Sequence, residues 1–215
     1  MKILVTGFDP FGGESINPAY EAVKELPDQI QGATIIKKEI PTEFKRSGEV
    51  LKELALEYKP DVILCVGQAG GRSGITVERV AINLAEARIA DNVGFQPSDM
   101  EIIKGGKPAY FATIPVKNMV EKIRERGLQG NISYTAGTFV CNSIMYNALA
   151  IAEKEVPGAK AGFIHVPFLP EQVTSKVEGT PSMSKESITA GLQAAIEAII
   201  EYDGEQADIK VGETH

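Results

Sequence analysis

The sequence predicts an α/β sandwich built on a largely parallel β-sheet. Short apolar runs of strand length alternate along the chain with longer segments that repeat apolar residues every three or four positions. The run DVILCV at Asp61–Val66 is apolar without a break, which is typical of a strand covered by helices on both faces. The 215 residues contain no linker, internal repeat or low-complexity tract, so we expect a single domain over residues 1–215.

The expected strands are short runs, mostly apolar and rich in β-branched side chains. In chain order they cover Lys2–Thr6, Thr34–Ile40, Asp61–Val66, Asn131–Thr135 and Ala161–Val166. Pro41 stops the second of them, because proline has no N–H for the hydrogen-bond ladder.

The expected helices repeat apolar residues at helical spacing. They cover Phe44–Tyr58, Val116–Gly127, Cys141–Glu155 and Ser184–Tyr202. The second ends in basic residues and a glycine, which is a common helix stop. The last is expected to begin with a capping box in which Ser184 and Glu186 flank the start, with Ser187 as an alternative cap.

Two segments lack clear periodicity. Ala90–Ala109 is rich in turn-forming residues, and a loop of that length inside a compact domain is usually functional or an excursion of the sheet. The tail after Tyr202 is polar, which favours poor order over about residues 203–215.

Composition and charge exclude several classes of function. The net charge is −7, from 22 basic and 29 acidic residues, whereas nucleic-acid and anionic-membrane partners require a basic surface. The apolar runs are too short to span a bilayer, and the N-terminal stretch MKILVTGFDP lacks the apolar core of a signal peptide. We therefore expect a cytoplasmic protein with no nucleic-acid partner and no membrane partner.

Cysteine and histidine are scarce. The two cysteines, Cys65 and Cys141, form no C-x-x-C motif, and the two histidines, His165 and the terminal His215, form no H-E-x-x-H motif. We therefore expect neither a disulfide framework nor a metal site. Catalysis that uses an internal imidazole has one candidate, His165.

Cys141 is the first residue of an expected helix, and two interpretations of it remain open. At a helix N-terminus the unpaired N–H groups and the dipole favour an anion, which lowers a thiol pKa and supplies donors for an oxyanion. Alternatively, Cys141 packs as a small apolar residue between Val140 and Ile144. Cys65 lies in the middle of a strand, and we expect it to belong to the core.

His165 lies in the apolar stretch GFIHVPF, where a lone histidine is commonly a core residue. It is also near the end of its strand, where ligands bind in open α/β sheets, and a cysteine nucleophile needs a base. A third group is expected to orient the imidazole. The acidic candidates are Asp9, Glu78, Glu86 and Asp91. Glu78 is preferred, because apolar residues surround it.

Glycine-rich loops follow two of the strands, GFDPFGG at Gly7–Gly13 and GQAGGRSG at Gly67–Gly74. Such loops often hold phosphates, but neither matches G-x-G-x-x-G or contains G-K-[ST]. The two phenylalanines of the first loop suit an apolar pocket for a ring better. Ordinary turn chemistry is the alternative for both loops.

Five stretches of the sequence carry recognisable motifs. They are TGFDPFGGESINP (Thr6–Pro18), CVGQAGGR (Cys65–Arg72), ITVERVAINLAEARIADN (Ile75–Asn92), SYTAGTFVCN (Ser133–Asn142) and GFIHVPFLPEQ (Gly162–Gln172). Together and in this order, they resemble the pyrrolidone-carboxylate peptidase, or pyroglutamyl-peptidase I, family of cysteine exopeptidases. The resemblance implies a single three-layer α/β/α domain with a mostly parallel, twisted sheet, commonly assembled as a homotetramer.

The resemblance also implies roles for individual residues. It makes Cys141 the nucleophile, His165 its base and Glu78 the acid that orients the imidazole. Arg88 borders the implied oxyanion site at Cys141. The implied pocket residues are Phe8, Phe11, Gln68, Ile89, Phe139 and Val140. The implied reaction hydrolyses an N-terminal pyroglutamyl residue from peptides through a thioester, with no metal and no cofactor.

Two other functions remain open at this level. A phosphate-dependent phosphorylase or nucleotide-binding α/β protein would use the glycine-rich loops and would be indifferent to iodoacetamide. A peptide-binding module would bind pyroglutamyl peptides without cleaving them.

Overall fold

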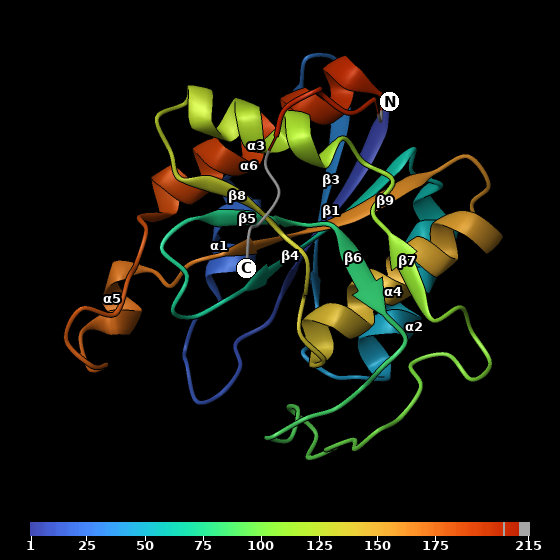
Figure 1. Ribbon diagram of the computed structural model, residues 1–215, viewed down its shortest axis with the longest axis vertical. Coiled ribbons are helices and arrows are strands. Elements are labelled where there is room, and N and C mark those ends of the chain that lie inside the picture. The colour runs from blue at the N-terminus through green and yellow to red at the C-terminus, as the bar shows by residue number, and fades with distance from the viewer. Residues whose placement is uncertain (204, 211–215) are drawn as a thin grey trace.

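The computed structural model describes residues 1–203 and 205–210, so His215 lies outside the described residues (Figure 1). Two β-sheets and six helices are present within this part of the chain. The strands are β1 (Lys2–Phe8), β2 (Gln29–Ile30), β3 (Ala33–Ile40), β4 (Val62–Gln68), β5 (Ile75–Glu78), β6 (Val80–Ile82), β7 (Ala109–Phe111), β8 (Gly130–Ser133) and β9 (Lys160–Val166). The helices are α1 (Pro18–Glu25), α2 (Arg46–Tyr58), α3 (Val116–Glu125), α4 (Val140–Lys154), α5 (Pro170–Val173) and α6 (Lys185–Tyr202).

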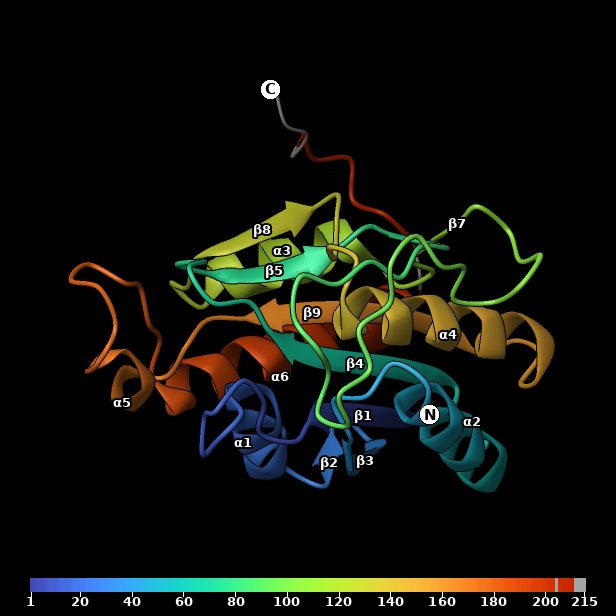
Figure 2. The ribbon, with the colours of Figure 1, turned by 90° about the horizontal axis from the view of Figure 1, so that it is seen from below.

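The central sheet has seven strands in the order β2-β3-β1-β4-β9-β5-β8, and Figure 2 shows them following one another across the molecule. The pairs β1–β3, β1–β4, β4–β9 and β5–β8 are parallel. The pairs β2–β3 and β5–β9 are antiparallel. The prediction of a mostly parallel sheet is confirmed, and the reversal between β9 and β5 is an addition that the sequence patterns did not indicate.

Helices cover both faces of this sheet. α1, α3 and α6 pack together on one face, and α2 packs with α4 on the other (Figures 1 and 2). The core between the layers contains the almost fully buried strands β1 and β4, as expected for strands covered on both sides. The predicted three-layer α/β/α arrangement is confirmed.

Helix α1 was not predicted, although its start carries a clear signal. Asn17 is the N-cap, its Oδ1 accepts a hydrogen bond of 3.1 Å from the Ala19 N–H, and Pro18 occupies the first helical position. Gly7 lets this helix approach the sheet, because a Cβ at position 7 would lie 2.6 Å from backbone atoms of Tyr20. Any larger residue there would push α1 away from β1.

Helix α6 begins at the predicted cap, but with a different partner. Ser184 is the N-cap, and its Oγ accepts a hydrogen bond of 3.2 Å from the N–H of Ser187, the third helical residue. Glu186 is the second helical residue, so the predicted capping box between Ser184 and Glu186 is wrong. The spacing of a capping box requires the acidic side chain at the position that Ser187 occupies.

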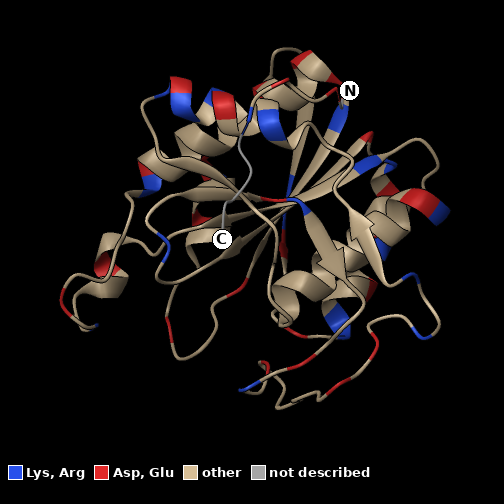
Figure 3. Cartoon of the chain, in the orientation of Figure 1, with Lys and Arg blue, Asp and Glu red and all other residues tan. Residues whose placement is uncertain are grey.

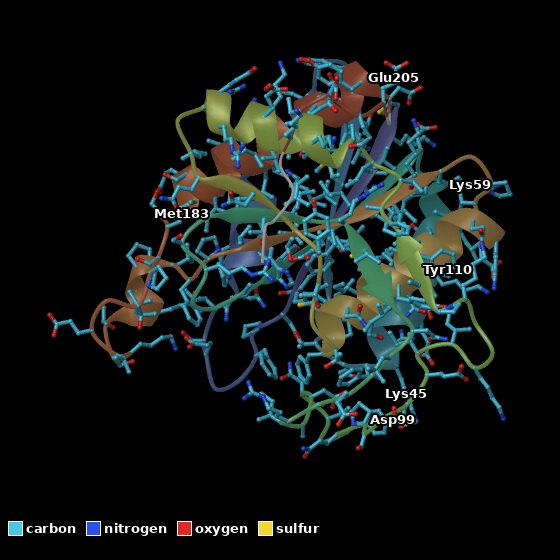
Figure 4. The ribbon with its side chains drawn as sticks, viewed as in Figure 1. Lys45, Lys59, Asp99, Tyr110, Met183 and Glu205 are labelled. Atoms are coloured by element: carbon cyan, nitrogen blue, oxygen red, sulfur yellow. The ribbon has the colours of Figure 1, made fainter. Side chains whose placement is uncertain are left out.

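The Ala90–Ala109 segment is an excursion that ends in a second, two-stranded sheet of β6 and β7. It is fastened to α4, because Tyr146 donates a hydrogen bond of 2.6 Å to the carbonyl of Lys107. Its other side reaches the start of α2, where the Lys45 ammonium lies over the Phe95 ring. Figure 4 shows Lys45 and Asp99 at this end of the molecule and Tyr110 on β7, beside α4.

Acidic and basic residues are interspersed along the outer helices and loops (Figure 3). No helix in the described part of the chain is long and apolar enough to cross a membrane. The prediction that the tail is poorly ordered falls partly on residues 204 and 211–215, which lie outside the described residues. Two described residues of the tail make hydrogen bonds near the start of α3. Gln206 donates to the Ile114 carbonyl over 2.9 Å, and the Ala207 N–H donates to Asn118 over 2.8 Å.

Candidate active site

The carboxyl ends of β1, β4 and β9 meet at one edge of the sheet. Phe8 ends β1, Gln68 ends β4, and His165 is the last residue but one of β9. Parallel strands bring residues from distant parts of the sequence to a shared edge, which is where open α/β sheets bind ligands. Three of the sequence-predicted site residues are therefore neighbours in space.

Strand β5 brings Glu78 to His165 because it runs against β9. Thr76 lies opposite His165 in this register, so Glu78, two residues later, is on the same face and diagonal to the imidazole. His165 Nδ1 is 2.7 Å from Glu78 Oε1, and both side chains are buried. An ionised carboxylate only accepts hydrogen bonds, so Nδ1 carries the proton and Nε2 is the acceptor.

The environment keeps Glu78 charged and His165 neutral. Burial alone would raise the pKa of Glu78, but the hydrogen bond with His165 and the nearby charge of Arg72 hold that pKa below its usual value. Burial lowers the pKa of His165, and the contact with Glu78 opposes this shift without cancelling it. The imidazole is therefore ready to accept a proton at neutral pH.

Cys141 is the second residue of α4, and its thiol lies over Gly67 of β4. Gly67 is the register partner of His165 on the neighbouring strand, and a Cβ at position 67 would lie 2.9 Å from Cys141 Sγ. The missing side chain of Gly67 thus makes the space for the sulfur. No side chain in the described chain caps the start of α4, so its first N–H groups are available to a ligand.

The expectation of a lowered thiol pKa at Cys141 is wrong for the free protein. Burial raises the pKa of Cys141 to about 12, the charge of Glu78 adds to the rise, and the charge of Arg72 opposes it. The Cys141 thiol and the His165 imidazole are therefore both neutral in the free protein. The thiolate forms only when the thiol proton is transferred to a base. Cys65 is fully buried in β4, as expected for a core residue.

A cavity of about 210 Å³ opens beside the sulfur. Its walls combine aromatic rings, the last residue of β4, the start of α4 and a few polar side chains from loops. The lining residues are Phe8, Phe11, Asn17, Thr42, Gln68, Gly70, Phe139, Val140 and Cys141.

A family model described as pyroglutamyl peptidase matches residues 1–202. The chain belongs to the pyroglutamyl peptidase family.

Sequence relatives agree with this assignment. The chain is 57% identical over 212 residues to a pyrrolidone-carboxylate peptidase of Streptococcus suis, covering 99% of this chain and 98% of the relative. It is 56% identical over 213 residues to the pyrrolidone-carboxylate peptidase of Lactobacillus johnsonii, again covering 99% and 98%.

Solved structures agree as well. Pyroglutamyl peptidase I of Bacillus amyloliquefaciens superposes with a TM-score of 0.91 at 46% identity, covering 95% of this chain and 98% of that one. A mutant pyrrolidone carboxyl peptidase of Pyrococcus furiosus superposes with a TM-score of 0.90 at 42% identity, covering 94% and 99%. The predicted family and the predicted enzyme class, a pyroglutamyl peptidase of the cysteine type, are confirmed.

In this pyroglutamyl peptidase, four phenylalanines form an aromatic row from the cavity to the Ala90–Ala109 excursion. The ring centroids of Phe11 and Phe139 are 5.2 Å apart, those of Phe139 and Phe44 are 5.1 Å apart, and those of Phe44 and Phe95 are 6.0 Å apart. The Phe139–Phe44 and Phe44–Phe95 contacts are edge-to-face and the Phe11–Phe139 contact is tilted by 45°. Aromatic contacts of this kind favour defined ring orientations. The cavity wall formed by Phe11 and Phe139 is therefore supported by two rings behind it.

Asp9 ties the loops that carry this row. Its Oδ1 accepts hydrogen bonds from the Thr42 N–H and hydroxyl, each 2.7 Å, and from Asn92 over 3.2 Å. Asp91 does similar work, accepting from the N–H groups of Phe44 and Phe95 over 2.9 Å each. Both had been candidates for orienting His165, and the structure places them in loop contacts instead.

The structure does not bring every predicted site residue into the cavity wall. Arg88 and Ile89 are exposed on a segment that runs beside the turn before α4, where the Thr138 hydroxyl donates a hydrogen bond of 2.8 Å to the Glu86 carbonyl. Glu86, the remaining acidic candidate, accepts from the Asp99 N–H over 2.7 Å. The roles of Arg88 and Ile89 stay predictions.

Sequence reasoning assigned no role to Asn17, Thr42 or Arg72. Asn17 carries a signal, since an asparagine before a proline is a typical helix start. Arg72 carries a weaker one, a charged residue in a glycine-rich loop six positions before Glu78. Nothing around Thr42 marks it as a cavity residue, because its place depends on the loop contacts of Asp9.

Proposed function

We propose that this pyroglutamyl peptidase cleaves its substrates with Cys141 as nucleophile, His165 as general base and then acid, and Glu78 as the orienting carboxylate. One observation supports these roles above the others. The buried Glu78–His165 contact of 2.7 Å adjoins Gly67, over which the Cys141 sulfur lies at the start of α4. An orienting carboxylate (Glu78), a base (His165) and a thiol nucleophile (Cys141) placed next to one another are the groups that a cysteine peptidase uses.

The substrate ring is an uncharged lactam, so its recognition needs apolar faces and a few hydrogen bonds. Phe11 and Phe139 supply the faces, and a cavity of about 210 Å³ suits a small ring. The Gln172 side-chain NH₂ donates a hydrogen bond of 3.0 Å to the side-chain oxygen Oε1 of Gln68, which leaves the Gln68 NH₂ group for the lactam carbonyl. Ile89 is proposed to close the cavity from the outside.

In the first step, His165 Nε2 takes the proton of the Cys141 thiol as the sulfur attacks the pyroglutamyl carbonyl carbon. The carbonyl oxygen becomes an oxyanion, which the Cys141 N–H and neighbouring N–H groups at the start of α4 stabilise, with Arg88 nearby. One such donor typically contributes a factor of about 10² to 10³. The imidazolium then gives its proton to the leaving nitrogen, the C–N bond breaks, and a thioester remains.

In the second step, His165 takes a proton from a water molecule, whose oxygen attacks the thioester carbonyl. The C–S bond breaks, the sulfur recovers a proton from His165, and free pyroglutamate leaves. Glu78 keeps the Nδ1 proton in place through both steps, so Nε2 always faces the reacting atoms.

A variant series with a pyroglutamyl chromogenic amide tests this proposal. Cys141→Ala is expected to abolish hydrolysis, and iodoacetamide is expected to inactivate the unmodified protein, while a chelator leaves it unaffected. Cys65→Ala is the matched control, because Cys65 is fully buried and does not line the cavity, and it is expected to keep activity. Activity in a folded Cys141→Ala variant would refute the assignment, and phosphate-dependent turnover would favour a phosphorylase.

We also propose that the protein acts in the cytoplasm as a homotetramer, both of which rest on the composition and the family resemblance. Light scattering of the purified protein tests the assembly, and a monomer at working concentrations would contradict it. Cell fractionation tests the location.

A further inference from the structure

The carboxylate of Glu78 has a second charged partner besides His165. Its Oε1 accepts a hydrogen bond of 2.7 Å from Arg72 Nη1, at the same length as the contact with His165 Nδ1. Its Oε2 is buried and has no hydrogen-bond partner among the described residues. One oxygen therefore carries both contacts, and Arg72 is the cation that faces the buried carboxylate.

Arg72 is held where it can serve this carboxylate. Its guanidinium also donates to the Thr76 hydroxyl and, over 3.4 Å each, to the Ser133 hydroxyl and the Thr135 carbonyl. The Arg72 side chain is 30% exposed, whereas Glu78 is fully buried, so water solvates the cation while its Nη1 reaches inward. The planar guanidinium has several donors in fixed directions and can therefore reach all of these oxygen acceptors, whereas a lysine ammonium could not.

We propose that Arg72 is a positioning residue that keeps Glu78 in its carboxylate form and, through Glu78, keeps His165 in the tautomer whose Nε2 accepts the thiol proton. The inference rests on the roles proposed above for Cys141, His165 and Glu78. It adds a fourth member that touches neither substrate nor sulfur.

The physical reason is the cost of a buried charge. A buried carboxylate without a cation tends to take up a proton, because burial disfavours its charged form. A protonated Glu78 would donate to His165 Nδ1, and the remaining imidazole proton would then sit on Nε2, facing the thiol. That tautomer cannot take a proton from Cys141, so the site would lose its base.

The electrostatics of the site agree with this geometry. The charged groups that act on His165 are Glu78 from β5 and Arg72 from the loop before β5. The Cys141 thiol from α4 lies over Gly67, the register partner of His165. The charge of Arg72 lowers the pKa of Glu78, of His165 and of Cys141 alike. Removing the cation is therefore expected to shift all three groups toward their protonated forms.

Three variants test the inference: Arg72→Gln, Arg72→Lys and the control Arg79→Gln. Arg79 is close in sequence but donates to the Ala112 carbonyl and stacks on Phe111, away from Glu78. The kcat, the KM and the pH profile of kcat/KM for a pyroglutamyl amide are measured with thermal unfolding of each variant. The rate of Cys141 alkylation by iodoacetamide is followed at each pH.

For Arg72→Gln we expect kcat to fall about 10²-fold or more with KM little changed, the loss typical of a disabled general base. The acid limb of the profile should move to higher pH and alkylation should slow. Arg72→Lys should lose less activity than Arg72→Gln and should shift the acid limb of the pH profile less, since lysine keeps the positive charge but lacks the planar guanidinium. Arg79→Gln should match the unmodified protein.

An unchanged kcat and an unchanged acid limb in Arg72→Gln would overturn the inference. A lowered unfolding temperature with an unchanged acid limb in either Arg72 variant would also overturn it, because it would show a purely structural residue. These outcomes are distinct from failure of the proposed function, which is judged by whether Cys141→Ala retains activity.

Discussion

Gly67→Ala is expected to disable the nucleophile by crowding it. A Cβ at this position would lie 2.9 Å from Cys141 Sγ and 2.7 Å from the Phe163 ring. Ordinary contacts between such atoms are about 3.5 Å or longer, so the sulfur must retreat by roughly 0.6 Å unless the ring and strand give way. Phe163 has little freedom, because its ring is fully buried and packs against the His165 ring at 4.8 Å.

The expected loss follows from the tolerance of catalytic geometry. A misplacement of about 1 Å costs on the order of 10²-fold in rate, so a shift of roughly 0.6 Å should lower kcat/KM by roughly tenfold to 10²-fold, or about 1.4 to 2.7 kcal/mol. Overpacking should also reduce the free energy of unfolding by about 1–3 kcal/mol. The assay is hydrolysis of a pyroglutamyl amide, with chemical denaturation to measure stability.

Gly162→Ala is the matched control. It adds the same methyl group in β9 but on the opposite face of the sheet, where it meets the Ile114 side chain rather than the sulfur. It should lower stability while the folded fraction keeps its kcat/KM. A folded Gly67→Ala variant with the kcat/KM of the unmodified protein would refute the placement of Cys141 Sγ over Gly67.

Three further results are expected. Because burial lowers the pKa of His165 below its usual value of about 6.5, kcat/KM should hold as pH falls through that value and drop only below it; an acid-limb midpoint above it would contradict the neutral resting pair. Glu78→Gln should lower kcat less than Cys141→Ala does. Asn142→Ala should reduce the free energy of unfolding by about 1–3 kcal/mol, since Asn142 is the partner of both the N–H and the carbonyl of Ile82. Urea denaturation measures the loss, and an unchanged midpoint would show that water replaces these bonds.

The elements with strong local patterns could be predicted from the sequence. β1, β4, α2, α4 and α6 lie within two residues of their expected bounds. Each of these strands contains a continuous apolar run, and each of these helices is long enough to show its apolar period. β5 could not be predicted in this way. It has four residues, and its direction is set by pairing with β9 and β8 rather than by its own composition.

Some features of the candidate site could likewise be predicted from the sequence, and others depend on the tertiary fold. Cys141 and His165 stand out because cysteine and histidine are rare in this chain, and Glu78 because its neighbours are apolar. The partners of Glu78 depend on which strand lies beside β5, and that is a property of the tertiary fold. The same holds for the thiol pKa, where the helix position alone suggested a fall and burial produces a rise.

The aromatic row also gives the protein a use in measurement. The chain contains no tryptophan, so one introduced at Phe95 would be the sole indole fluorophore. Phe95 touches Phe44 and lies two ring contacts from the cavity wall at Phe139, so an indole there would sense the cavity without entering it. Binding of the lactam and formation of the thioester would then be followed in real time, with unlabelled peptides and without a chromogenic leaving group.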